Sequence, residues 1–385
     1  MLCGEHLPVA PPRSIWRMSR EHRPDDPDQG WKLHVSATVL TAERTLAAVA
    51  PELHARGVLF KAPGTLTELH RLNCGLFYGT SQIGKFVSVY PRSPQEAVEL
   101  AERLDEKTRA LPGPNVPFER QYRRGSRVFY RYGSFSGRRA EFDGVTRPAL
   151  RPPDGGMIQD VRTDPDFDPW WCRNPFPRKA ERRGRPSLFR TRYLVFEPLT
   201  QRGKGGVHKA LEMTGTPMRT CVVKEGRLHG ETGWDGRDGR DGRKLVLAEA
   251  RMLQDLAAAG VDVPAVREVF VEQRNAYLVL EHLGDRTPEQ VVREAGVLPV
   301  REALHLAGAL AAGVADVHEA GRAWRDVKPR NAVVDGTGLV RPIDFEGACR
   351  SDARNVSVGR DGRGLRRYRA AGRRRAGRRR GRRRR

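Results

Sequence analysis

The sequence predicts an α+β protein of two domains, and three observations support this. A chain of 385 residues, of which 38% are hydrophobic, has room for about two or three packed domains. Short alternating strands and amphipathic helices interchange over residues 1–145, and a second series of strands begins at residue 193. Residues 146–188 are rich in Pro, Arg and Asp, which predicts a linker. We therefore expect a second domain over 189–350 and a separate segment over 351–385.

The elements of the first domain follow from hydrophobic periodicity. The stretch 30–37 alternates, so as a strand it places Lys32, His34 and Ser36 on one face. Further strands are predicted over 58–61, 84–90 and 127–135. Helices are predicted over 41–56, 65–73 and 94–111, the last beginning after a capping box that starts at Ser93.

The polar residues on these strands are mostly cationic. The candidates are Lys32, His34, Lys61, Lys85, Tyr130 and Arg131. Several cations in one cleft suit a dianion such as a phosphate monoester. Crowded cations also lower the pKa of a lysine, which then becomes a usable base, while a protonated histidine can serve as an acid. This pattern predicts β-elimination of phosphate from phosphoserine or phosphothreonine. The alternative is that these are solvated residues on half-exposed strands.

A second set of polar residues occurs near the end of the second domain. Asp326, Lys328 and Asn331 lie in one loop after a long predicted helix (299–320), and Asp344 ends a short strand (339–343). Phosphoryl transfer requires such parts: an Asp to accept the proton of the attacking hydroxyl, a Lys to neutralise the phosphoryl group, and an Asn and an Asp to hold Mg²⁺. The order and spacing favour this interpretation over a polar turn.

Residues earlier in this domain complete a predicted nucleotide site. A turn with Gly203, Gly205 and Gly206 lets backbone N–H groups approach the phosphates of ATP. Lys224 ends a strand (220–224), and Glu249 lies on a helix (244–259), as in the lysine–glutamate pair of kinases. Glu281 follows a strand (275–280) in a predicted hinge over adenine. ATP and Mg²⁺ are therefore the expected cofactors.

The first domain resembles the N-terminal lyase domain of class III lanthipeptide synthetases, which is related to phosphothreonine lyases of bacterial effectors. The resemblance covers most of residues 29–136 and rests on the segments 29–37, 60–61, 84–86 and 130–133. It implies a phosphothreonine-lyase-like fold with His34 as the acid. It implies Lys61 as the base, with Lys32 as the alternative. Lys32, Lys85 and Arg131 would hold the phosphate, with Tyr130 or Tyr90 nearby.

The second domain resembles the kinase domain of the same synthetases. Asp344-Phe345-Glu346 replaces the usual Asp-Phe-Gly, and Trp324 stands where many kinases have His. The resemblance implies ATP-dependent phosphorylation of Ser and Thr in a ribosomal precursor peptide, followed by elimination to dehydroamino acids. The family pattern ends at Arg350, so the sequence predicts a truncated kinase-like domain without a cyclase. Weak or absent phosphorylation by this chain alone, and no ring formation, are the corresponding expectations.

The segment 351–385 carries most of the net charge of +23. It contains 16 Arg and two Asp, a net charge of +14, so the other 350 residues carry about +9. The segment has too few apolar residues to bury a core. Three interpretations compete: a polycation that binds nucleic acid or other polyanions, a tail without a role, or a shifted reading frame. The alternative function for the whole chain is a kinase-like binding protein that acts through this basic tail.

Composition also predicts the compartment. No run of about 18 apolar residues suggests a membrane span, and the polar N-terminus lacks the apolar core of a signal peptide. The five cysteines are scattered and show no CxxC spacing, which predicts reduced thiols without structural zinc. We therefore expect a cytoplasmic protein.

Overall fold

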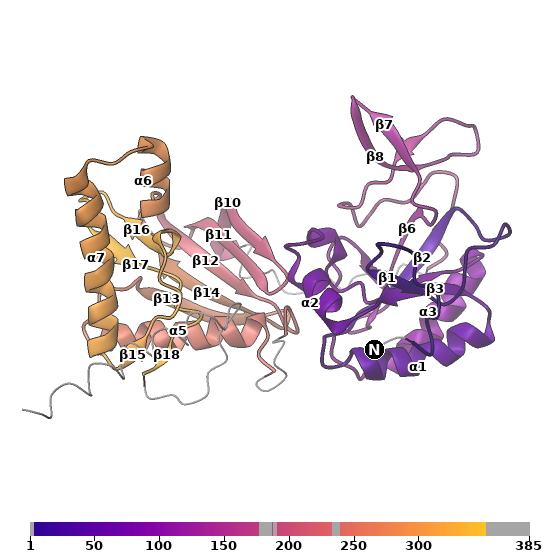
Figure 1. Cartoon of the computed structure of the whole chain (residues 1–385), viewed down its shortest axis with the longest axis horizontal. Coiled ribbons are helices and arrows are strands. Elements are labelled where there is room, and N and C mark those ends of the chain that lie inside the picture. The colour runs from indigo at the N-terminus through magenta and orange to yellow at the C-terminus, as the bar shows by residue number, and fades with distance from the viewer. Residues whose placement is uncertain (1–3, 177–186, 188–190, 233–238, 352–385) are drawn as a thin grey trace, which may run out of the picture. The chain divides into compact units, whose positions relative to one another are not determined.

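The computed structural model describes residues 4–176, 187, 191–232 and 239–351. The N-terminal part is built on a six-stranded sheet in the order β1-β3-β4-β2-β6-β5 (Figure 1). The strands are β1 (Trp16–Met18), β2 (Gln29–Val35), β3 (Leu59–Pro63), β4 (Val87–Tyr90), β5 (Arg120–Gln121) and β6 (Val128–Ser134). All five neighbouring pairs are antiparallel. The mixed helix and sheet class predicted from the sequence is confirmed.

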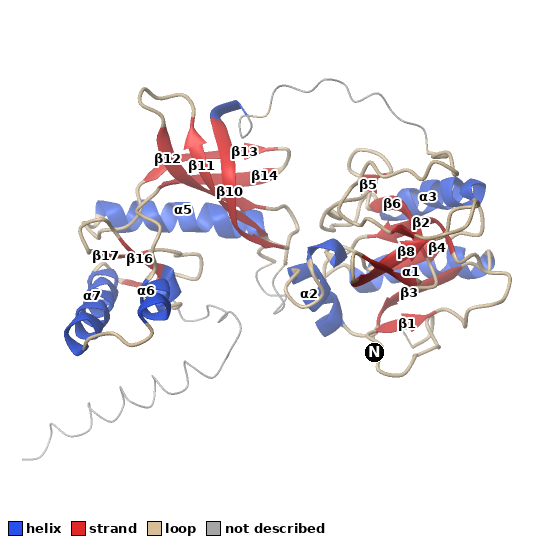
Figure 2. Ribbon diagram, turned by 90° about the horizontal axis from the view of Figure 1, so that it is seen from above, coloured by secondary structure: helices blue, strands red, loops and turns tan. Residues whose placement is uncertain are grey.

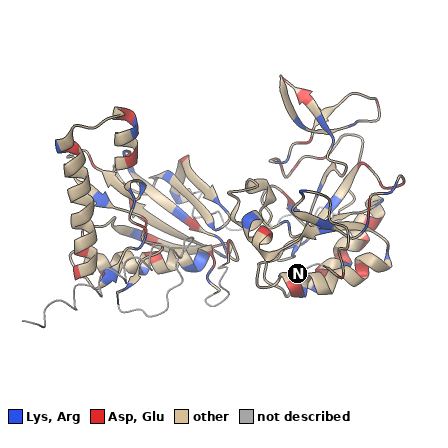
Figure 3. Ribbon diagram, viewed as in Figure 1, with Lys and Arg blue, Asp and Glu red and all other residues tan. Residues whose placement is uncertain are grey.

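Two helices, α1 (Ala42–Ala55) and α3 (Pro94–Thr108), pack together and cover one face of this sheet (Figures 1 and 2). The core between them contains Leu33, Leu46 and Leu100, each fully buried. The hydroxyl of Ser93 accepts a hydrogen bond from the Glu96 N–H, as the predicted N-cap requires. The exposed faces of both helices carry charges of both signs (Figure 3). A third helix, α2 (Leu66–Cys74), connects β3 to β4 through the 3-10 turn η1 (Thr80–Gln82).

The register of the sheet separates a polar face from this apolar face. His34 lies opposite Ser88 of β4, and Ser88 lies opposite Lys61 of β3. Lys32 lies opposite Arg131 of β6. Residues directly opposite in an antiparallel pair share a face, so these side chains project to the same side. The predicted alternation of β2 is therefore confirmed.

The segment that the sequence assigned to a linker is in large part folded. β7 (Arg139–Phe142), β8 (Val145–Leu150) and β9 (Ile158–Gln159) form a three-stranded sheet that the sequence did not predict. Leu150 and Phe176 are buried in the core of the N-terminal domain, and Trp171 packs against it. The structure thus extends the first domain from the predicted boundary at 145 to Phe176. Residues 177–186 and 188–190 of the predicted linker lie outside the described residues.

The next part is a five-stranded sheet in the order β10-β11-β12-β14-β13, with α5 (Gly242–Ala258) after β12 (Figure 2). The strands are β10 (Tyr193–Arg202), β11 (Gly205–Glu212), β12 (Arg219–Gly226), β13 (Val266–Glu272) and β14 (Asn275–Glu281). Tyr193, Val223 and Val279 belong to its core. The Asp241 carboxylate accepts from the Lys244 N–H and so caps the start of α5. Residues 233–238, between β12 and α5, lie outside the described residues.

The last described part contains α6 (Pro288–Ala295) and α7 (Val300–Glu319). It also contains the strands β15 (Arg322–Ala323), β16 (Ala332–Val334), β17 (Val340–Pro342) and β18 (Cys349–Arg350), with the 3-10 turn η2 (Pro329–Asn331). Thr287 forms a complete capping box with Gln290 at the start of α6. Leu306 of α7 is buried against β16 and β17 in a small core.

The described chain divides into two compact units. The first is Met1–Leu247 with Arg267–Leu280, and the second is Ala248–Val266 with Glu281–Arg385. Residues 352–385 of the predicted basic tail lie outside the described residues. Within the described part of the chain, no helix is both long and apolar enough to span a membrane.

Candidate active sites

The first candidate site lies on the polar face of the six-stranded sheet. Lys61, Ser88 and His34 stand in one row across β3, β4 and β2. Strands are about 4.8 Å apart, so Lys61 and His34 are separated by about 10 Å at the backbone. Lys32 stands two residues before His34 on the same strand, about 7 Å away at the backbone. The sheet therefore presents a histidine with one lysine on each side.

A buried carboxylate joins two of these cations. The Glu119 side chain, 1% exposed, contacts His34 Nδ1 at 2.7 Å and Lys85 Nζ at 2.6 Å. Burial lowers the pKa of His34 to about 4, although Glu119 opposes this shift. Burial also lowers the pKa of Lys85. Burial alone would raise the pKa of Glu119, but the charges of His34 and Lys85 reverse this and hold it below its usual range.

Lys32 and Arg131 form the second part of the site. Lys32 Nζ donates to the Ser134 carbonyl at 2.7 Å, and Arg131 pairs with the Asp160 carboxylate. Burial, followed by the charge of Arg131, lowers the pKa of Lys32 well below its usual value. A Cβ on Gly133 would lie 2.8 Å from Lys32 Cε and would collide with the Arg131 guanidinium. Glycine at this position therefore leaves the space that the two cations occupy.

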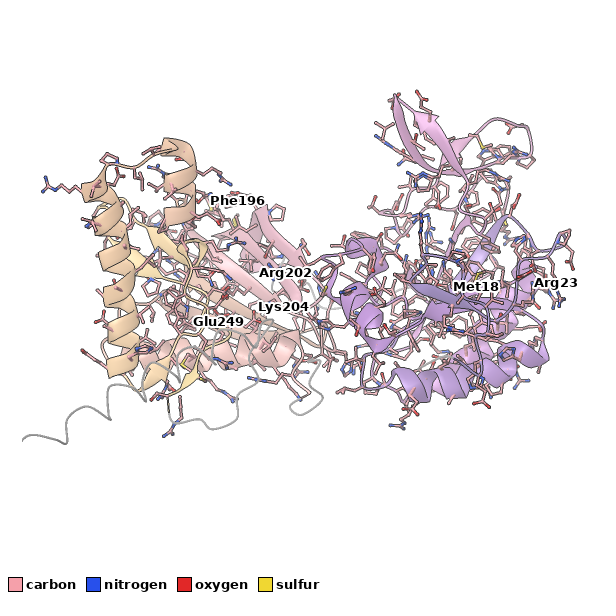
Figure 4. All side chains as sticks on the ribbon, viewed as in Figure 1. Met18, Arg23, Phe196, Arg202, Lys204 and Glu249 are labelled. Atoms are coloured by element: carbon pink, nitrogen blue, oxygen red, sulfur yellow. The ribbon has the colours of Figure 1, made fainter. Side chains whose placement is uncertain are left out.

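Lys61 is half-buried at the other end of the row. Its Nζ lies 4.5 Å from the centroid of the Trp16 ring and 5.8 Å from that of the Tyr90 ring. Met18 of β1 is its cross-strand partner (Figure 4). Tyr90 stands two residues after Ser88, on the same face. Of the two tyrosines that the sequence offered as neighbours of the phosphate, Tyr90 is the one on the polar face.

Tyr130 is the predicted site residue that the structure does not bring to this face. It lies opposite Leu33, on the apolar side of β2 and β6. Its ring stacks on Phe176 with centroids 3.8 Å apart, within the domain core. The sequence prediction failed here because Tyr130 and Arg131 are adjacent on a strand, and adjacent residues point to opposite faces.

Sequence reasoning missed two acidic residues of the site. Glu119 follows a proline-rich loop without periodicity, and Asp160 lies in the segment assigned to a linker. The Asp160 side chain is fully buried, and the Arg131 charge helps to hold its pKa below the usual value against the effect of burial. The one available signal was general: a cluster of buried cations requires buried carboxylates for compensation.

The second candidate site begins with the loop between β15 and β16. The Asp326 carboxylate accepts from Lys328 Nζ and, at 3.0 Å, from Asn331 Nδ2. The Asn331 N–H also bonds to the Lys328 carbonyl, which closes the η2 turn. Three residues predicted for phosphoryl transfer are thus brought together within one loop.

The loop that carries Asp344 is held by contacts from Trp324 and Glu249. Trp324 Nε1 donates to the Asp344 carbonyl at 3.2 Å, and its ring stacks on Phe345 at 5.4 Å. The Phe345 N–H donates to Glu249 Oε1 at 2.9 Å, with Glu249 located on α5 (Figure 4). Asp344 has a positive φ of 63°, a conformation that aspartate tolerates better than most residues. Trp324, which precedes the loop of Asp326, therefore connects that loop to the loop of Asp344.

These residues fit a magnesium ion. Mg²⁺ prefers oxygen ligands, and Asp344 supplies a carboxylate. The amide nitrogen of Asn331 is directed to Asp326, which leaves the amide oxygen of Asn331 as the ligand atom.

The remaining predicted nucleotide-binding residues lie on both units. In the first, Gly203 and Lys204 make the turn of the β10–β11 hairpin, Gly205 and Gly206 begin β11, and Lys224 of β12 lies opposite Val207. In the second, Glu281 ends β14 and accepts from the Ala265 N–H at 3.3 Å.

Comparison with known proteins assigns both domains. Residues 10–187 match the model of the RamC N-terminal domain, and residues 203–371 match the protein kinase domain. The kinase match extends past the predicted boundary at residue 350. The probable SapB synthase of Streptomyces coelicolor is 30% identical over 352 residues, which are 88% of this chain and 37% of that protein.

Several serine/threonine-protein kinases match shorter stretches of the chain. The serine/threonine-protein kinase F of Synechocystis is 27% identical over 187 residues, or 46% of this chain and 37% of that kinase. The serine/threonine-protein kinase PknA of Mycobacterium tuberculosis is 34% identical over 113 residues, or 29% of this chain and 26% of that kinase. The chain thus spans little more than a third of the length of these relatives, or less.

Proposed function

Because this chain carries the RamC N-terminal domain and the protein kinase domain of the class III lanthipeptide synthetases, we propose that it converts Ser and Thr of a peptide to dehydroamino acids. The second domain phosphorylates the hydroxyl with ATP, and the first eliminates the phosphate. The observation that carries the proposal is the row of Lys61, Ser88 and His34, flanked by buried cations. The peptide is a ribosomal precursor, as the resemblance implies.

The elimination requires one base and one acid. Lys61, as the neutral amine, takes the α-proton of the phosphorylated residue, and the electron pair of that C–H bond forms the Cα=Cβ double bond. The Cβ–O bond breaks, and the departing phosphate oxygen receives a proton from His34. The separation of about 10 Å between the backbones of the two residues leaves space for the phosphorylated residue between their side chains.

Lys32, Lys85 and Arg131 hold the phosphate. All three are at most 8% exposed, so their charges act in an environment with little water. Glu119 and Asp160 compensate part of this charge while no phosphate is bound. A phosphate dianion that binds here stabilises the protonated forms of the neighbouring lysines, because a nearby opposite charge favours the charged form. This effect also raises the pKa of His34 and allows it to become the acid.

Steady-state kinetics with a phosphothreonine peptide test this assignment. Lys61→Ala should lower kcat by about 10²-fold or more with a similar KM, because the base is lost and the anchors remain. Lys85→Ala should chiefly raise KM. Lys107→Ala, an exposed residue of α3, is the matched control and should change neither constant. If Lys32→Ala lowers kcat while Lys61→Ala does not, Lys32 is the base; full activity of both variants would reject the site.

For the kinase domain we propose a proton-accepting role for Asp326. Lys328 would neutralise the phosphoryl group in transfer, and Asn331 and Asp344 would hold Mg²⁺, which would neutralise charge on the phosphates of ATP. The resemblance to kinases assigns Gly203, Gly205 and Gly206 to the phosphates, Lys224 and Glu249 to the lysine and the glutamate of the kinase pair, and Glu281 to the adenine hinge. The buried contacts of Trp324 support this arrangement by fixing the loop of Asp344.

A further inference from the structure

The contacts of Glu119 go beyond those of an ordinary structural carboxylate. Glu119 stands one residue before β5, whereas His34 is on β2 and Lys85 lies in the segment just before β4, and the Glu119 side chain is 1% exposed. One oxygen faces His34 Nδ1 at 2.7 Å and the other faces Lys85 Nζ at 2.6 Å. Glu119 therefore contacts both His34, the proposed acid, and Lys85, a proposed phosphate-binding residue.

The charge state of Glu119 determines the protonation of the histidine ring. The two neighbouring cations keep the carboxylate ionised, so it can accept hydrogen bonds but cannot donate one. The proton between the two groups therefore belongs to His34 Nδ1. In the neutral imidazole this leaves Nε2 without a proton and available to the ligand.

We propose that Glu119 is the positioning residue of the elimination: it accepts the Nδ1 proton of His34 and so reserves Nε2 for the phosphate oxygen that departs. This inference rests on the proposed function. Nε2 gains its proton when the phosphate dianion binds and passes it to the leaving oxygen as the Cβ–O bond breaks. The titratable groups that face His34 are Glu119, Lys85 and Lys32.

Glu119 also competes with substrate for Lys85. Phosphate and Glu119 both attract the same ammonium, so Glu119→Gln should not weaken binding of the phosphopeptide. Glutamine keeps only one acceptor oxygen, which the Lys85 ammonium attracts, so the NH2 group is left facing His34 Nδ1 and no longer favours a proton there. The expected result is a kcat at least about 10-fold lower with a KM that does not rise. A carboxylate that only stabilised the fold would lower the amount of active protein without this separation of the two constants.

Nitrogen-15 NMR of histidine-labelled full-length protein tests the positioning without any need for turnover. At neutral pH, the His34 signals, assigned with His34→Asn, should show a protonated Nδ1 and a bare Nε2. Addition of inorganic phosphate should then protonate Nε2. Glu119→Gln should lose the Nδ1–H preference, whereas Glu106→Gln, on the exposed face of α3, should keep it.

The outcomes separate this inference from the proposed function. An Nε2-protonated His34 in the wild-type protein, or a Glu119→Gln variant with unchanged ring signals and unchanged kcat, would overturn the role of Glu119. Absence of elimination by the wild-type protein, with the expected ring signals present, would instead count against the lyase assignment. The wild-type spectrum is informative even if Glu119→Gln does not fold.

Discussion

Burial of single residues determines the charge of the N-terminal site. His34 is 4% exposed, and its pKa is lowered to about 4 from the ordinary 6.5. Between these two pH values the unfolded chain carries a proton on His34 that the folded protein does not. The unfolded state thus binds more protons in this window, and the free energy of unfolding falls as the pH decreases from about 6.5 to about 4.

This linkage predicts the behaviour of His34→Asn, which removes the titrating group. Each pH unit in the window costs the wild-type protein up to about 1.4 kcal/mol, so the loss of stability between pH 7 and pH 5 should be smaller in the variant. Chemical denaturation of both proteins at the two pH values measures the difference. His22→Asn, an exposed residue of the same domain, should behave like the wild type. Equal losses in all three proteins would show that His34 is not buried as a neutral group.

Some of the site residues could be predicted from a local sequence pattern, and others could not. Lys32 and His34 were predictable because a two-residue period placed them on one strand face, and the register confirms this. The prediction for Tyr130 was wrong because the same two-residue period places Tyr130 and Arg131 on opposite faces of β6. Glu119 is 85 residues away in sequence from its partner His34, and Asp160 is 29 residues away from its partner Arg131. Both contacts depend on loops that fold back onto the sheet, and no local sequence pattern predicts such a contact.

Strand β6 supplies Arg131, a proposed phosphate-binding residue, and also Gly133, which leaves room for the Arg131 side chain. A Cβ on Gly133 would meet the ends of Arg131 and Lys32, which are flexible side chains rather than backbone. Gly133→Ala should therefore displace the two cations at little cost in stability. The expected result is a KM for the phosphopeptide raised by about 10-fold or more, since hydrogen bonds to charged groups contribute about 1.5–3 kcal/mol.

The control for Gly133→Ala is Gly4→Ala, where an added Cβ meets nothing within 4 Å. Thermal unfolding of both variants checks that the fold is intact. An unchanged KM in a folded Gly133→Ala protein would show that Lys32 and Arg131 do not bind the phosphate.

Elements with strong periodicity or caps were predicted well. The helix after Ser93 and the long helix predicted over 299–320 are found where the sequence placed them. The sheet of β7, β8 and β9 was missed because its strands are short and most of it lies in a segment rich in Pro, Arg and Asp, a composition that resembles a linker. Its connection to the core depends on Leu150 and Phe176, which are isolated apolar residues in the sequence.

For the whole molecule, the matches to a RamC N-terminal domain and a protein kinase domain confirm the resemblance to class III lanthipeptide synthetases. Two chemical steps on separate domains should be separable by mutation. With ATP and an unmodified Ser/Thr peptide, Lys61→Ala should accumulate phosphopeptide. Asp326→Asn should leave that peptide unmodified and still eliminate phosphate from a phosphorylated one.

Mass spectrometry of the products distinguishes these outcomes. The Lys61→Ala reaction is the more sensitive assay of the kinase step, because phosphopeptide builds up instead of being consumed. Loss of elimination in Asp326→Asn would contradict the assignment of the two steps to separate domains.

The most direct test of the proposed lyase activity is the intact mass of a chemically phosphorylated Ser/Thr peptide after incubation with this chain in the absence of ATP. We expect loss of the elements of phosphoric acid, which leaves a dehydroamino acid. A product that regains the free hydroxyl, which indicates hydrolysis, or an unchanged phosphopeptide in the presence of folded protein, would contradict it.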